Sequence, residues 1–148
     1  MRRLGVDDLP ALLELERAAQ VLPWTSAALR EELAHVDGEV LGVFAPALVG
    51  YISLRRIVDE LWILNLATHP DHRRAGIASG LISAAKDRAT SSAALWLEVR
   101  EGNAAARALY EHHGFSVVGR RPGYYPAVGP QGAREAAVLM RAAKIGKR

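Results

Sequence analysis

The chain has 148 residues, of which 50% are hydrophobic and 24% charged, and this composition excludes a disordered or fibrous protein. One domain of this length can bury a core, so we expect residues 1–148 to form a single domain with one active site. The absence of cysteine excludes disulfides, a thiolate nucleophile and a cysteine metal site, and a formal charge of +3 is too small to predict a nucleic-acid partner.

The first residues do not resemble a targeting segment. Acidic side chains interrupt the apolar stretch near the N-terminus, at Asp7, Asp8, Glu14 and Glu16, which is unlike a secretory signal. No apolar run approaches the roughly 18 residues that a membrane-spanning helix needs. We therefore expect a cytoplasmic protein with no membrane attachment.

The N-terminal half predicts two helices followed by strands. Leucines recur at helical spacing over about residues 7–19, and a second helix follows from Thr25 or Ser26, either of which can cap it, to about Ala34. Residues 38–57 contain two apolar runs around a Pro-containing break, a pattern typical of an antiparallel hairpin. The almost continuous apolar run over residues 60–70 predicts a central strand that is covered on both faces.

The C-terminal half alternates helices and strands. An amphipathic helix is predicted over residues 76–89 and a strand over 94–100. Asn103 is expected to cap a helix that ends near His113, with Gly114 left-handed after it. Two more strands are expected over residues 114–120 and 134–141, with a Pro- and Gly-rich loop between them over residues 121–132. Residues 143–148 are expected to form a frayed basic tail. This order predicts an α/β (α+β) domain with a parallel strand–helix–strand crossover in the middle of a mixed sheet.

The stretch LNLATHPDHRRAGIASGLI, residues 64–82, contains the first chemical signal. An apolar strand enters a short basic loop, which turns directly into a helix. The first amides of a helix have no partners within it, and together with Arg73 and Arg74 they favour a pyrophosphate. Gly76 lets the backbone come close to such a ligand. Taken alone, the pattern is neither a P-loop nor G-x-G-x-x-G, and an ordinary strand-to-helix turn explains it equally well.

A second stretch, LWLEVREGNAAARALYEHHGF, makes a resemblance specific. Combined with the Arg-x-x-Gly-x-Ala loop of residues 73–78, it resembles the acetyl-CoA site of GNAT acetyltransferases. The chain is similar to RimI-type ribosomal-protein alanine N-acetyltransferases at residues 22–25, 58–60, 65–78, 95–115 and 123–126. The resemblance implies a GNAT fold, with a mixed, mostly antiparallel sheet flanked by about four helices.

The same resemblance implies how acetyl-CoA is held. Leu66, Ala67 and Thr68 would offer backbone groups to the acetyl and pantetheine portions, and Asn103 would touch the cofactor. The residues expected around the pyrophosphate are Arg73, Arg74, Ala75, Gly76, Ile77, Ala78 and Ser79. No metal is expected, because the histidine pairs of the chain each offer at most two ligands.

The resemblance also implies a general base, Glu98, and a general acid, Tyr110. Their chemistry is suitable, because a tyrosine with a pKa near 10 is protonated at neutral pH and can protonate a thiolate whose pKa is near 8.5. Other interpretations remain open from the sequence. Glu98 could be a salt-bridged strand residue, Tyr110 could be a packed core residue, and Glu60 is a rival base.

Four residues are candidate acceptor contacts: Trp24, Glu60, Tyr124 and Tyr125. In the family, the Pro-Trp turn after the first helix lies near the acceptor, and the tyrosine pair is expected to shape its entrance. RimI-type sequences usually have Glu-Asp-Ala in the last strand, whereas this chain has Glu135, Ala136 and Ala137 after a longer loop. These departures affect the acceptor and leave the acetyl-CoA chemistry unchanged.

We therefore expect direct acetyl transfer, in a ternary complex, from acetyl-CoA to the N-terminal alanine of a small-subunit ribosomal protein. The expected partner is the N-terminus of that protein, the enzyme is expected to be a monomer, and no direct nucleic-acid binding is expected. Lysine side chains, small amines and aminoacyl-tRNA are alternative acceptors. An alternative of another class is a non-catalytic module that binds CoA or RNA.

Overall fold

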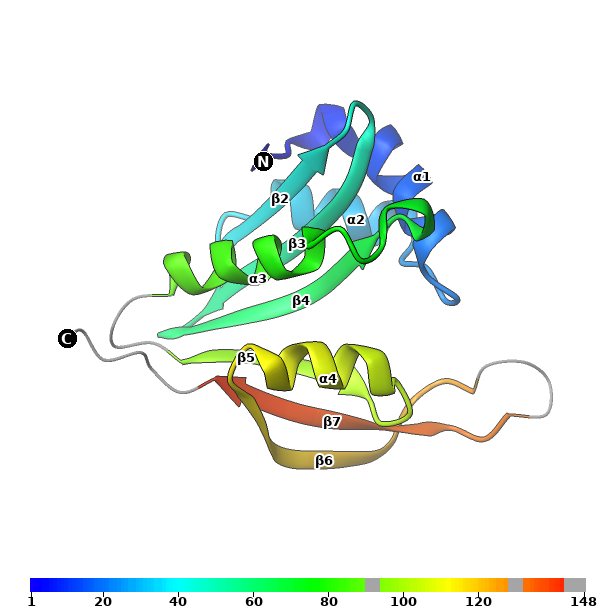
Figure 1. The fold of residues 1–148 in the computed structure, drawn as a ribbon, viewed down its shortest axis with the longest axis vertical. Coiled ribbons are helices and arrows are strands. Elements are labelled where there is room, and N and C mark those ends of the chain that lie inside the picture. Colours follow the sequence, from blue (N-terminus) through cyan, green and yellow to red (C-terminus); the bar gives the residue numbers. More distant parts are fainter. Residues whose placement is uncertain (90–93, 128–131, 143–148) are drawn as a thin grey trace.

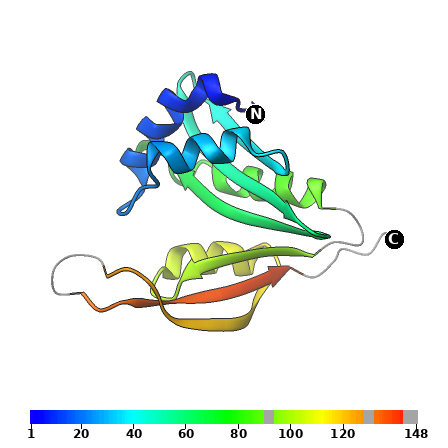
Figure 2. The same cartoon turned by 180° about the vertical axis from the view of Figure 1, so that it is seen from behind.

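A computed structural model describes residues 1–89, 94–127 and 132–142. A seven-stranded sheet with helices on both of its faces forms this part of the chain (Figures 1 and 2). The expected basic tail, residues 143–148, lies outside the described residues. None of the helices in the described ranges is long and apolar enough to cross a membrane.

The order of the elements agrees with the order that the sequence predicts. In chain order they are β1 (Arg2–Arg3), the 3-10 helix η1 (Val6–Asp8), α1 (Leu9–Ala19), α2 (Ser26–Ala34), β2 (Gly38–Phe44), β3 (Leu48–Ile57), β4 (Glu60–Thr68), the 3-10 helix η2 (Pro70–His72), α3 (Ile77–Arg88), β5 (Leu95–Arg100), α4 (Ala104–His112), β6 (Phe115–Tyr125) and β7 (Glu135–Ala142). The strands lie side by side in the order β1-β2-β3-β4-β5-β7-β6. Among the described strands only β4 and β5 are parallel neighbours, so the predicted mixed, mostly antiparallel sheet with a crossover through α3 is confirmed.

Short polar side chains and one glycine fix the helix ends. The side chain of Thr25 accepts a hydrogen bond from the amide of Ala28 at 3.1 Å and begins α2. Asn103 does the same for α4, accepting from the amide of Ala106 at 3.1 Å. Gly114 follows α4 with a φ of 88°, a left-handed conformation that glycine adopts without steric cost. All three of these predicted end signals are confirmed.

Each face of the sheet has its own hydrophobic core. On one face α1 and α2 bury Leu12 and Leu29 against Tyr51 of β3. On the other face α3 buries Leu81 and Ile82 against the central strands, and α4 packs beside it. Since a fully buried leucine contributes about 1.5–3 kcal/mol, these residues hold the helices firmly on the sheet.

Two strands differ from the prediction. The chain from Arg121 onward was expected to be loop, but β6 continues to Tyr125, with irregular pairing to β7 between Arg121 and Tyr125. Pro122 is tolerated there because β6 is the edge strand of the sheet. The second difference is β1, which was not predicted because two residues are too few to show periodicity.

The central strands β4 and β5 separate after a short paired stretch. Their parallel pairing covers residues 61–63 and 95–97 only. At that point Ser53 of β3 lies opposite Asn65 while Leu54 lies opposite Ile63, which leaves Leu64 as an extra residue in β4. Such a β-bulge bends its strand, and Figure 1 shows β4 turning away from β5. The sheet is therefore open in its middle.

Candidate active site

A groove of about 930 Å³ lies where β4 and β5 separate. Its walls come from segments far apart in the sequence: residues 62–66 of β4, residues 97–100 of β5, the end of α1 with the segment that follows it, one side of α4 from Ala106 to Tyr110, the end of β6 and the start of β7. Of the predicted site residues, the groove brings together Glu98, Tyr110, Leu66, Asn103, Trp24, Tyr124 and Tyr125.

Glu98 reaches the groove from one face of β5. The alternation along this strand buries Leu95, Leu97 and Val99 in the core beneath α3 and α4, so Glu98 points to the opposite face. Its side chain is 20% exposed, and Nη2 of Arg121 lies 3.5 Å from Oε1. This contact is long and the arginine is mostly exposed, so the ion pair leaves the carboxylate accessible from the groove.

Tyr110 enters the groove from α4, on the other face of the sheet. Its ring is buried edge-on against Phe115, with the centroids 5.6 Å apart. Burial, reinforced by the nearby Tyr125 hydroxyl, raises the pKa of Tyr110 above its ordinary value, so the phenol remains protonated. Because Glu98 and Tyr110 belong to opposite faces, both can contact one substrate only where the sheet is open.

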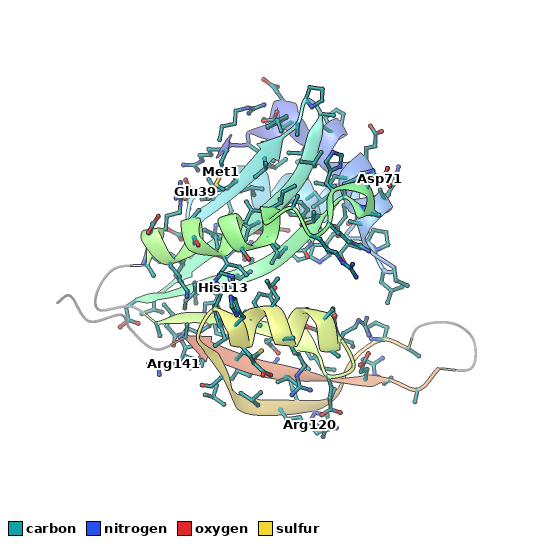
Figure 3. The ribbon with its side chains drawn as sticks, viewed as in Figure 1. Met1, Glu39, Asp71, His113, Arg120 and Arg141 are labelled. Carbon is teal, nitrogen blue, oxygen red and sulfur yellow. The ribbon has the colours of Figure 1, made fainter. Side chains whose placement is uncertain are left out.

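The loop between β4 and α3 has the geometry of an anion site. Arg74 and Gly76 have φ values of 66° and 76°, and the left-handed Gly76 directly precedes the right-handed first turn of α3, an alternation that directs successive amides into a concavity. Gly80 is the first amide of α3 that donates back into the chain, to the carbonyl of Gly76 at 3.0 Å. The preceding amides of residues 77–79 remain available to a ligand. This loop, which Asp71 marks in Figure 3, therefore suits the pyrophosphate of a coenzyme.

The β4 edge that faces the groove can receive the rest of such a molecule. Leu66, Ala67 and Thr68 pair with β3 on one side, and in the described ranges β4 has no strand partner on the other side beyond Ile63. Their outward backbone groups resemble those of an edge strand, which are ready to bond an amide-containing arm. Asn103 lines the groove, and because only its side-chain oxygen caps α4, its Nδ2 is not used by that cap.

A histidine connects the two helices beside the loop. Figure 3 shows His113 between α3 and α4, and its Nε2 lies 3.1 Å from Oγ of Ser79. Burial, followed by the charge of Lys86, lowers the pKa of His113, so the neutral ring is favoured. The contact links the C-terminal end of α4 to the first turn of α3.

The acceptor candidates fall into two groups. Trp24, Tyr124 and Tyr125 line the groove, and the two tyrosine rings meet edge to face at 5.0 Å. Burial raises the pKa of Tyr125 to about 12, and the charge of Glu98 contributes to this rise. Glu60 lies at the opposite end of β4, where Nε1 of Trp62 is 3.4 Å from its Oε1, and it does not line the groove.

Several residues of the groove wall were not singled out in the sequence. They are Glu16, Gln20, Leu64, Asn65, Gly102 and Ala106. A signal existed for two of them. Glu16 occupies the position four residues after Leu12 on the buried stripe of α1, and Asn65 interrupts the apolar run of β4. A polar residue at such a position requires buried partners.

The family described as the Acetyltransferase (GNAT) family matches residues 9–115. The chain belongs to this family. It is 34% identical over 143 residues to the [ribosomal protein bS18]-alanine N-acetyltransferase of Escherichia coli, covering 93% of this chain and 92% of that relative. The corresponding enzyme of Haemophilus ducreyi is 32% identical over 135 residues, covering 90% and 92%. Both relatives therefore match along nearly their whole length.

Solved structures support the same family assignment. The crystal structure of the ribosomal-protein-S18-alanine N-acetyltransferase from Escherichia coli superposes with a TM-score of 0.84 at 30% identity, covering 99% of this chain and 93% of that one. NAA60 of Arabidopsis thaliana, at 19% identity and a TM-score of 0.83, shares the fold. The predicted GNAT fold is confirmed, and the chain is an acetyl-CoA-dependent N-acetyltransferase, as the sequence indicated.

Proposed function

We propose that this GNAT enzyme acetylates the α-amine of an N-terminal alanine, and that its acceptor is a small-subunit ribosomal protein in the cytoplasm. The main support is the similarity to relatives whose names state this acceptor, which extends over 90% or more of each chain. The groove adds a chemical argument, because it is lined by both the Glu98 carboxylate and the Tyr110 phenol, which reach it from opposite faces of the sheet. A protein N-terminus could reach that space past Trp24, Tyr124 and Tyr125.

In this proposal Glu98 takes a proton from the ammonium group of the acceptor, directly or through one water. An α-amine, with a pKa of about 7.7–8.0, loses that proton far more readily than a lysine near 10.4. The freed nitrogen lone pair attacks the thioester carbonyl carbon, a C–N bond forms, and the C–S bond breaks. Tyr110 gives its hydroxyl proton to the departing sulfur, and the second proton that the nitrogen loses on becoming an amide restores the Tyr110 phenol. The transfer is direct and needs no acyl-enzyme.

The cosubstrate is held on the other side of the opening. The amides of residues 77–79, with Arg73, Arg74, Ala75 and Gly76, receive the pyrophosphate, and the free edge of β4 receives the pantetheine arm. Asn103 contacts the cofactor from the start of α4. This arrangement leaves the thioester between Glu98 and Tyr110 with the acceptor side of the groove open.

Two matched peptides test the acceptor. One begins with a free alanine, and the other has the same sequence, a blocked N-terminus and one internal lysine. We expect the purified enzyme to label the free peptide alone with acetyl groups, as measured by mass spectrometry. Equal labelling of the blocked peptide would show a lysine acetyltransferase, and labelling of neither, with turnover of aminoacyl-tRNA or small amines, would also overturn the proposal.

The pH dependence tests the proton donor. We expect kcat/KM for the free peptide to rise up to about pH 8, as the α-amine becomes neutral. At higher pH we expect kcat/KM to stay level until at least about pH 10. The acid form of Tyr110 is the active one, and burial raises its pKa, so the loss of that form moves to higher pH. The measurement is a kcat/KM profile in buffers of constant ionic strength. A decline that starts below about pH 9.5 would contradict a tyrosine in this environment.

A further inference from the structure

Glu16 of α1 is a fully buried carboxylate, with 0% of its surface exposed, at the acceptor end of the groove. Within the described ranges no Lys, Arg or His side chain forms an ion pair with it. Hydrogen-bond donors satisfy its oxygens instead: the hydroxyl of Tyr51 donates to Oε1 at 2.7 Å, and the amide of Trp24 to Oε2 at 2.8 Å. Asn65 adds its Nδ2 at 3.2 Å from Oε2. A buried carboxylate without a cation is costly unless its donors are held in place.

These donors connect separate walls of the groove. Trp24 belongs to the segment between α1 and α2, Tyr51 to β3, and Asn65 to β4 just after its bulge. The side-chain oxygen of Asn65 in turn accepts from the amide of Leu66 at 3.0 Å and from Nε2 of Gln20 at 3.0 Å. A continuous hydrogen-bonded path therefore runs from the acceptor wall to the β4 edge that is proposed to meet the thioester.

The segment between α1 and α2 has few other anchors. Val21 is 78% exposed and Leu22 is 46% exposed, so neither contributes much buried apolar area, and Trp24 is half-buried. The bond from the Trp24 amide to Glu16 therefore links the Trp24 end of this segment to α1, and through Tyr51 and Asn65 to the sheet, while Gln20 at its other end bonds Asn65. Hydrogen bonds to charged groups are among the stronger ones in proteins.

We propose that Glu16 is a positioning residue for the acceptor. Its carboxylate fixes the segment around Trp24 relative to β4 and so sets the width of the acceptor end of the groove. This inference rests on the proposed function, since it concerns how that same acceptor is bound. Glu16 does not act as a base, because it has no exposed surface and its oxygens already accept hydrogen bonds.

Glu16→Gln tests this role. Glutamine keeps one acceptor oxygen, but it is uncharged and its NH₂ group cannot accept a hydrogen bond, so the donors of Tyr51, Trp24 and Asn65 lose one acceptor and bond the remaining one more weakly. We expect the KM for the free N-terminal peptide to rise roughly tenfold, while kcat and the acetyl-CoA Kd stay within about twofold. A residue with only a structural role would lower the Tm without separating the peptide KM from these quantities.

Glu32→Gln is the matched control. Glu32 of α2 is also a buried carboxylate, 6% exposed, and it bonds Ser53 and Arg55 of β3 away from the groove. We expect this variant to lose stability and to keep the wild-type peptide KM. If both variants raise the peptide KM equally, the effect is general loosening and the inference is wrong.

Hydrogen exchange of the Trp24 amide, followed by NMR, gives a readout that needs no acceptor. Exchange is expected to be at least about tenfold faster in Glu16→Gln and unchanged in Glu32→Gln. If the wild type fails to acetylate the peptide, the proposed function fails, and the exchange rate still decides this inference. Should Glu16→Gln not fold, Glu16→Asp keeps the charge with a shorter reach, and the same changes are expected. Wild-type exchange and wild-type peptide KM in a folded variant overturn the inference.

Discussion

Glu98→Gln is expected to lower kcat for peptide acetylation by about 10²–10⁴-fold, with the acetyl-CoA Kd within about twofold of the wild type. Glutamine keeps the length of the side chain and can still bond Arg121, but it cannot take the proton of the acceptor ammonium. Glu98 lies on the face of β5 that is opposite to the α3 and α4 core, so the fold does not depend on its charge. Steady-state kinetics with the free peptide and calorimetric titration with acetyl-CoA measure the two quantities.

Glu60→Gln separates Glu98 from its rival. Glu60 lies at the other end of β4 and does not line the groove, so we expect its kcat to stay within about twofold of the wild type. The opposite pattern, a normal Glu98→Gln and a slow Glu60→Gln, would move the base to Glu60. A higher pH should not fully restore the kcat of Glu98→Gln, because the variant still lacks a group at this position that can accept the proton of the acceptor amine.

Local signals made much of the fold predictable. Two helices begin at residues whose side chains cap them, Thr25 and Asn103, and α4 is followed by Gly114, which has no side chain to oppose a left-handed backbone. Such local effects need no tertiary context. The leucine spacing of α1 and the apolar stripe of α3 likewise follow from the helical period. The loop at Gly76 was predicted from residue types, and its φ of 76° gives the physical reason for a glycine there.

The opening of the sheet could not be read from the sequence. It depends on one extra residue, Leu64, inside an almost continuous apolar run, where the spacing of apolar residues gives no sign of a bulge. The bulge shifts the alternation of β4, so that Asn65 faces α1 and Leu66 packs toward the other core. Sequence motifs therefore indicated Glu98 and Tyr110 without showing that they belong to opposite faces.

The buried polar contacts of the acceptor wall were also missed. Glu16 lies among leucines on α1, and its partners Tyr51 and Asn65 are 35 and 49 residues away along the chain. Helical periodicity identifies such a position as buried but cannot say which donors satisfy it. Pairings of this kind are set by tertiary packing, which is why this wall of the groove was less predictable than the helix ends.

Tyr110→Phe is expected to reduce kcat by about 10²–10⁴-fold with little change in stability or in the acetyl-CoA Kd. The phenylalanine ring retains the edge-on contact with Phe115, so only the proton donor is lost. Without it, the sulfur must leave as a thiolate or take its proton from water. Steady-state kcat, the Tm and the acetyl-CoA Kd together separate this chemical effect from a packing effect.

Tyr125→Phe is the informative comparison, because Tyr125 lies in the same groove and its hydroxyl affects the pKa of Tyr110. As an acceptor contact, Tyr125 is expected to change the peptide KM and to leave kcat within several-fold of the wild type. If Tyr125→Phe lowered kcat by orders of magnitude while Tyr110→Phe turned over normally, the donor would be Tyr125. Slow turnover of both variants with normal peptide KM values would mean that the two hydroxyls pass the proton in sequence, and Tyr110 alone would then be an incomplete account of the acid.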